Sequence, residues 1–154
     1  MKNFLCIVFF AFALNTFGQD FATLQNYEFK SVESYKTQES EVLKCANYLF
    51  GNPADSSELN RLISAQFIMK WMEGTPDYTF SIDQKAMELT KGSTDLLGLY
   101  LAAMSKTVLE KPDTKLSNDE IYNASENLLV TYCSNKANNI KPSKHIKKLL
   151  KSKK

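Results

Sequence analysis

Residues 94–110, TDLLGLYLAAMSKTVLE, are apolar on nearly every side when they are projected as a helix. Such a helix is normally central, because it leaves no polar face for solvent. Pro112 prevents the helix from continuing. This stretch therefore predicts a helical core that the rest of the chain must cover.

Five further segments surround this core with helical periodicity. Apolar residues recur on each at intervals of three and four, which is the spacing of one helix face. The segments are 33–50, 56–73, 83–91, 118–134 and a short one that begins near Ser143. In the segment at 56–73 the apolar stripe consists of Leu59, Leu62, Ile63, Phe67 and Trp71, widened by Ile68 and Met72. Together with 94–110 the five segments predict an all-α fold, a compact single-domain bundle of five or six antiparallel-packed helices.

The ends of these helices carry their own signals. The first two segments stop at Gly51-Asn52-Pro53 and Gly74-Thr75-Pro76, where glycine permits a left-handed C-terminal residue and proline prevents continuation. Ser117 and Glu120 have capping-box spacing, and Asp55 and Glu58 repeat it with aspartate in first place.

The whole chain has 154 residues, of which 44% are hydrophobic and 23% charged, and this excludes intrinsic disorder. Residues 1–18 are typical of a secretory signal peptide, with Lys2 before an apolar run at 4–14 that is too short to span a bilayer. We therefore expect an exported protein, periplasmic or secreted, without a transmembrane span. The expected organisation is a signal peptide at 1–18, a loose lead-in at 19–32, a helical domain at 33–140 and a lysine-rich short helix or tail at 141–154.

Cysteine and histidine content limits the expected cofactors. Removal of the signal peptide takes away Cys6 and leaves Cys45 and Cys133. An oxidising compartment favours a disulfide between them, and the alternative is two buried free thiols. His145 is the only histidine and the five glycines show no phosphate-binding spacing, so neither a metal nor another cofactor is expected.

The most distinctive stretch is FIMKWMEGTPDYTF at 67–80, which holds the only tryptophan and three other aromatic residues. One interpretation is an aromatic-lined pocket or partner surface. Its candidate binding residues are Trp71, Asp77, Tyr78 and Phe80. The alternative is a packed corner at the end of a helix, in which the aromatic side chains complete the core.

Three carboxylates flank the connector at residues 75–82. Glu73, Asp77 and Asp83 are candidates for the acid–base residues of a hydrolase. In the alternative, they are a helix C-terminal acid, a turn aspartate and a helix N-cap. We assign no catalytic residue, and we expect an exported, non-catalytic binding or interaction protein whose protein or small-molecule partner is unknown.

Charge is unevenly distributed along the chain. Residues 20–140 carry a net charge of −6, whereas residues 141–154 contain seven lysines and no acidic residue. Candidates for contact with an anionic surface are Lys144, Lys147, Lys148 and Lys151. In the alternative, the segment docks through Ile146, Leu149 and Leu150 and its lysines are solvated. Export and the acidic body disfavour nucleic acid as a partner.

Two stretches resemble known groups of proteins. The segment at 67–80 looks like one in small exported helical Bacteroidota proteins of unknown function, over about residues 40–135, and this resemblance implies no activity. The segment CANYLFG at 45–51, with the distant Cys133, is similar to the Cys-x-x-Tyr-Leu/Ile-x-Gly opening and late cysteine of periplasmic disulfide-bonded immunity proteins. That second resemblance implies a Cys45–Cys133 bridge, and an immunity-like or periplasmic stress role as an alternative function.

Overall fold

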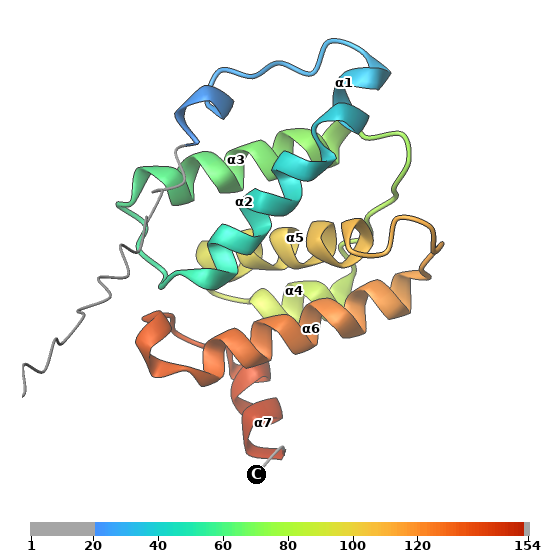
Figure 1. Ribbon diagram of the computed structural model, residues 1–154. Coiled ribbons are helices and arrows are strands. Elements are labelled where there is room, and N and C mark those ends of the chain that lie inside the picture. The colour runs from blue at the N-terminus through green and yellow to red at the C-terminus, as the bar shows by residue number, and fades with distance from the viewer. Residues whose placement is uncertain (1–20, 153–154) are drawn as a thin grey trace, which may run out of the picture.

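The computed structural model describes residues 21–152, and within this range all regular secondary structure is helical (Figure 1). The prediction of an all-α fold is confirmed, while the predicted signal peptide at 1–18 lies outside the described residues. The α-helices are α1 (Val32–Thr37), α2 (Glu39–Gly51), α3 (Leu59–Gly74), α4 (Gln84–Thr90), α5 (Thr94–Leu109), α6 (Asn118–Ser134) and α7 (Lys144–Ser152), with 3-10 turns η1 (Ala22–Leu24) and η2 (Lys136–Asn138).

The helix α5 occupies the centre of the bundle, as its sequence predicts. Eleven of its sixteen residues are buried. In Figure 1 the helices α2 and α3 lie on one side of α5, and α4 and α6 lie on the other; all four contact it. The final helix α7 packs against α6 and α4 at one end of the molecule.

The predicted helix at 33–50 is interrupted at Gln38, and this produces one helix more than expected. The Gln38 N–H donates to the Tyr35 carbonyl across three residues, at 3.3 Å. The same carbonyl accepts a hydrogen bond from the indole Nε1 of Trp71, at 3.1 Å. The Tyr35 carbonyl, which a continuous helix would offer to the Glu39 N–H, is therefore shared between a local and a tertiary donor at the break, and no local pattern displays the tertiary donor.

The start of α3 differs from the predicted capping box. Glu58 itself is the N-cap, and its carboxylate accepts from the backbone N–H groups of Asn60 and Arg61 at 2.9 and 2.8 Å. Asp55 instead accepts from the Ser57 N–H in a turn before the helix, at 2.9 Å. The capping box predicted for α6, between Ser117 and Glu120, is confirmed.

The buried stripe of α3 is rotated relative to the prediction. Ile63, Phe67, Ile68 and Trp71 are buried, but Leu59 and Leu62 are 58% and 51% exposed. The buried side of the first turn belongs instead to Arg61, whose guanidinium donates to the carbonyls of Leu49 and Asn52 at 3.0 and 3.3 Å. These two bonds satisfy the open C-terminal end of α2, which favours a cation.

The predicted Cys45–Cys133 disulfide is wrong for this structure. Both cysteines are buried and free. Cys45 lies on α2 and Cys133 on α6, and α5 packs between these helices and contacts both (Figure 1). Burial raises the pKa of the Cys45 thiol to about 12 and that of Cys133 to about 11. The alternative of two buried thiols therefore holds, and the bridge implied by the immunity-protein resemblance is absent.

None of the helices in residues 21–152 is both long enough and apolar enough to cross a membrane.

Candidate functional site

The connector at 75–82 is fastened to the core by Trp71. The tryptophan side chain is 0% exposed, so it has no surface for a ligand. Its ring packs against Tyr78 and Phe80, with centroids 5.6 and 5.9 Å apart. The backbone N–H of Thr75 donates to the Trp71 carbonyl and ends the helix. Trp71 is therefore a core residue that fixes the path of the connector.

A cleft of about 840 Å³ lies beside the connector, and we call it the connector cleft. One wall is formed by residues 76–79 and the other by residues 112–117 between α5 and α6, with Val108 and Ile121 contributing apolar surface. Its volume falls in the range of about 300–1,000 Å³ that is usual for ligand pockets. Of the four predicted binding residues, Asp77 and Tyr78 line this cleft, and Trp71 and Phe80 lie outside it.

Negative charge is concentrated around Tyr78. Burial raises the pKa of its hydroxyl, and the carboxylates of Glu39, Asp77 and Asp113 raise it further. The pKa of Glu39 is also raised, first by burial and then by Asp77, against the opposing charge of Lys36. The electrostatic field at the Tyr78 hydroxyl therefore favours a cation and disfavours an anion.

The three carboxylates proposed for a hydrolase have separate surroundings. Asp83 is the N-cap of α4, and its carboxylate accepts from the Ala86 N–H at 3.0 Å. Glu73 is exposed at the end of α3, and only Asp77 of the three lines the connector cleft. Glu39 of α2 interacts with Asp77, and Asp113 of the α5–α6 loop interacts with the adjacent Tyr78, and no spacing in the sequence indicates either neighbour. In residues 21–152, no group of three or more His, Cys, Asp and Glu side chains is arranged to hold a metal ion.

A contact between α6 and α7 has no signal in the sequence. The Tyr122 hydroxyl donates to Glu126 Oε2 at 2.7 Å, and His145 Nε2 lies 3.9 Å from the same oxygen. Burial raises the pKa of Tyr122, and the hydrogen bond to Glu126 adds to this effect. His145 thus faces the body of the protein, although Lys144 and Lys147, which lie close to it in sequence, are exposed.

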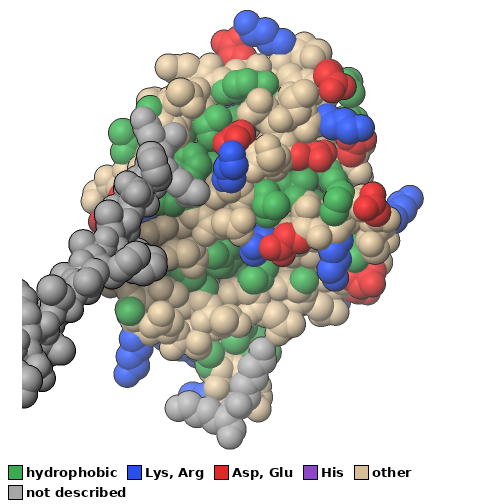
Figure 2. All heavy atoms as spheres, viewed as in Figure 1, with side chains coloured by type: hydrophobic (Ala, Val, Ile, Leu, Met, Phe, Trp, Pro, Cys, Tyr) green, Lys and Arg blue, Asp and Glu red, His purple; other side chains and the backbone are tan. Residues whose placement is uncertain are grey.

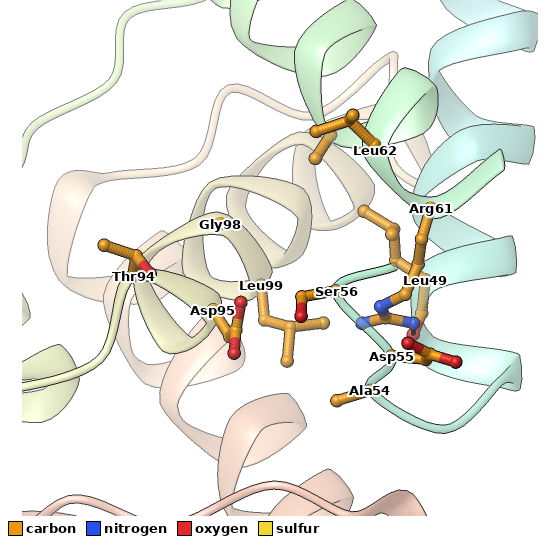
Figure 3. Close-up of a pocket in the computed structure, with 11 residues that line it drawn as sticks. Leu49, Ala54, Asp55, Ser56, Arg61, Leu62, Thr94, Asp95, Gly98 and Leu99 are labelled. Atoms are coloured by element: carbon orange, nitrogen blue, oxygen red, sulfur yellow. Dashed lines mark hydrogen bonds between the residues drawn. The ribbon is translucent and has the colours of Figure 1, made fainter. Parts of the chain in front are cut away.

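A second, smaller pocket lies between the α2–α3 loop and the start of α5 (Figure 3). It measures about 140 Å³, and Figure 3 shows Asp55 and Ser56 on one side and Thr94 and Asp95 on the other. The Arg61 guanidinium at its edge already donates to two carbonyls of α2 and the following loop. This pocket is smaller than a usual ligand site, so the connector cleft is the better candidate of the two.

The four candidate lysines of α7 are all exposed. Ile146 on the opposite side of the helix is fully buried, and Leu149 and Leu150 are partly buried against the core. The segment is therefore docked, with its lysines directed to solvent.

No protein-family model matches this sequence, no curated protein matches it, and no solved structure matches its fold.

Proposed function

We propose that this is an exported, non-catalytic interaction protein that binds its partner in the connector cleft. The observation that carries the proposal is the cleft itself, about 840 Å³ in volume and lined by both apolar and charged side chains. Val108, Leu116 and Ile121 supply apolar surface, and Asp77 and Asp113 supply carboxylates. This combination of apolar walls and a few convergent polar groups is typical of binding sites.

The partner is expected to present a positively charged group. Three carboxylates act on the Tyr78 hydroxyl, and Lys115 is the basic residue in the wall of the cleft. An ammonium or guanidinium group beside Tyr78 can pair with Asp77 and lie against the tyrosine ring, which attracts cations through its face. A basic side chain of a partner protein and a small amine both meet this requirement.

The walls of the cleft are held in place before any partner arrives. Tyr78 packs on the fully buried Trp71, and the opposite wall ends in the Ser117–Glu120 capping box. A preorganised site loses less conformational entropy on binding. This rigidity supports recognition of one defined shape.

A thermal-shift screen with amines and with short peptides that pair lysine or arginine with an aromatic residue tests the proposal. A ligand that binds the folded state raises the melting temperature, and mass spectrometry of the recovered ligand shows whether it stays intact. We expect Asp77→Asn and Tyr78→Ala to abolish the shift. Glu88→Gln removes one exposed negative charge on α4 and serves as the matched control.

Two results would contradict the proposal. If wild type and Asp77→Asn respond equally to every ligand, the connector cleft is not the binding site. If the recovered ligand is cleaved by wild type and intact after incubation with Asp77→Asn, the protein is an enzyme, as the hydrolase alternative holds.

A further inference from the structure

The helix α7 separates apolar and basic side chains onto opposite faces. Ile146 is fully buried and Leu149 and Leu150 are partly buried, so this side faces the bundle. The opposite side is the lysine face, which consists of Lys144, Lys147, Lys148 and Lys151, all exposed. Their spacing of three and four residues places them in one row along the helix. Because α7 lies at one end of the molecule (Figure 1), this row is accessible to a flat surface.

The lysine face has no acidic partner within the described chain. The ion pairs of residues 21–152 engage Lys30, Lys44, Lys85 and Lys106, and none involves a lysine of α7. His145, on the flank of the helix, is the α7 residue that approaches a carboxylate, that of Glu126. In the view of Figure 2 the acidic side chains gather away from the α7 end, where lysines are seen. Four positive charges are thus held in a row without neutralisation.

A groove of about 660 Å³ lies between the end of α6 and α7, on the Leu150 side of the helix, and we call it the α7 groove. Cys133, Ile140, Pro142 and Leu150 contribute its apolar surface. Lys136 and Lys141, both exposed, lie at its edge. The α7 end of the molecule therefore offers positive charge and an apolar recess side by side.

We propose that the α7 end binds the surface of an anionic phospholipid membrane. Lysine is a flexible point charge suited to a diffuse layer of phosphates, whereas a specific bidentate site would use arginine. The only arginine of the chain, Arg61 of α3, is buried against the end of α2. Polybasic surfaces bind anionic lipid headgroups in this way. The α7 groove admits the apolar part of a lipid next to its headgroup, a feature that an acidic protein or a nucleic acid does not require.

This inference is independent of the connector cleft. The cleft contacts the first turn of α6, and the α7 groove contacts its last turn. Sixteen residue steps separate Asn118 from Ser134, and a helix rises about 1.5 Å per residue, so the two sites lie roughly 24 Å apart along α6. If the proposal for one site fails its test, the proposal for the other site is unaffected.

Co-sedimentation of the full chain with vesicles is the test. Vesicles of equal parts phosphatidylglycerol and phosphatidylcholine are compared with vesicles of phosphatidylcholine alone, between about 50 and about 300 mM NaCl, since salt screens these charges. We expect binding to the anionic vesicles only, falling steeply with salt. Each lysine near an anionic bilayer strengthens binding about fivefold, so Lys→Gln at all four positions of the lysine face is expected to weaken it by more than about a hundredfold.

The matched control replaces four exposed lysines elsewhere, Lys36, Lys70, Lys91 and Lys111, by glutamine. This variant has the same net charge as the lysine-face variant and is expected to retain most of the vesicle binding. If the two variants lose binding equally, net charge alone is responsible and the proposal is overturned. Equal binding of wild type to phosphatidylcholine vesicles would overturn it as well.

The α7 groove separates lipid from other polyanions. Ile140→Ser, with Ile140→Thr as a variant that keeps the β-branched shape, removes apolar surface without changing charge. We expect either variant that retains the wild-type melting temperature to weaken binding to anionic vesicles by about threefold to tenfold and to leave binding to heparin unchanged. Vesicle binding that is unaffected by both variants, together with tight binding to heparin, would assign the lysine face to a polyanionic macromolecule instead.

Discussion

Replacement of Trp71 by alanine is expected to destabilise the protein severely. The side chain is 0% exposed, its indole N–H donates to the Tyr35 carbonyl, and its ring packs against Tyr78 and Phe80. Truncation of a buried tryptophan or phenylalanine to alanine usually costs about 3–5 kcal/mol. Domains of this size are stable by about 5–15 kcal/mol, so Trp71→Ala is expected to lose a large share of the total.

A second substitution separates the hydrogen bond from the packing. Trp71→Phe retains an aromatic ring but leaves the Tyr35 carbonyl with one donor fewer, which should cost about 0.5–1.5 kcal/mol beyond the loss of ring volume. The change should also loosen α1, because this bond joins the end of α1 to α3. Hydrogen exchange at the amides of α1 would report that loosening.

Urea denaturation followed by far-ultraviolet circular dichroism is the appropriate assay for both variants, because they lack the fluorescent indole. A free energy of unfolding for Trp71→Ala within about 1 kcal/mol of wild type would refute the assignment of Trp71 to the core. In that case the tryptophan would be available for ligand binding, as the alternative interpretation of the sequence holds.

Three further predictions follow from the described residues. Gly98→Ala is expected to raise the free energy of unfolding by about 0.5–1 kcal/mol, since a methyl group there meets no atom within 4 Å and alanine favours the helix; a lower stability in urea would contradict this. Cys45 and Cys133 are expected to resist a thiol reagent at pH 8 until the protein is denatured, because burial raises the pKa of each; an oxidised mass for the folded protein would contradict the two free thiols. Hydrogen bonds from the Ser117 backbone N–H and hydroxyl lower the pKa of Glu120 in the folded protein. The stabilisation that the Glu120 carboxylate provides is therefore fully present above the unfolded pKa of about 4.3, and it is lost as the pH falls through the lower folded pKa. The difference in melting temperature between wild type and Glu120→Gln should therefore shrink on acidification, and a difference that is constant with pH would show that the carboxylate charge is not involved.

Much of the fold could be predicted from the sequence, because its signals are local. Because residues 94–110 are apolar on nearly every side, the sequence predicts α5 at the centre, and the Ser117–Glu120 spacing predicts the start of α6. The Asp83 cap of α4 likewise depends on neighbours within one turn. Such features require only that a residue and its partner lie close in the chain.

The features that the sequence could not indicate depend on tertiary partners. The break at Gln38 lies where the Tyr35 carbonyl accepts from the indole of Trp71, 36 residues away. The exposure of Leu62 follows from Arg61, whose carbonyl acceptors belong to the end of α2 and the loop after it. Helical periodicity identifies an apolar stripe, but long-range polar bonds decide its rotation.

The candidate site was half predictable for the same reason. Asp77 and Tyr78 could be selected because the aromatic stretch at 67–80 is unusual in composition. The facing wall, which includes Asp113 and Leu116, has no unusual composition and is identified only by the packing of the α5–α6 loop against the connector. A free cysteine pair was likewise indistinguishable from a bridge until the position of α5 between α2 and α6 was known.

The most direct test of the proposed function is the map of backbone amide chemical-shift changes on titration with the ligand that gives the largest thermal shift. The connector cleft predicts that the largest changes fall at residues 77–79 and 113–118, on its two facing walls, and that they disappear in Asp77→Asn. Changes confined to other parts of the bundle, with both walls unaffected, would contradict the claim that this protein binds its partner there.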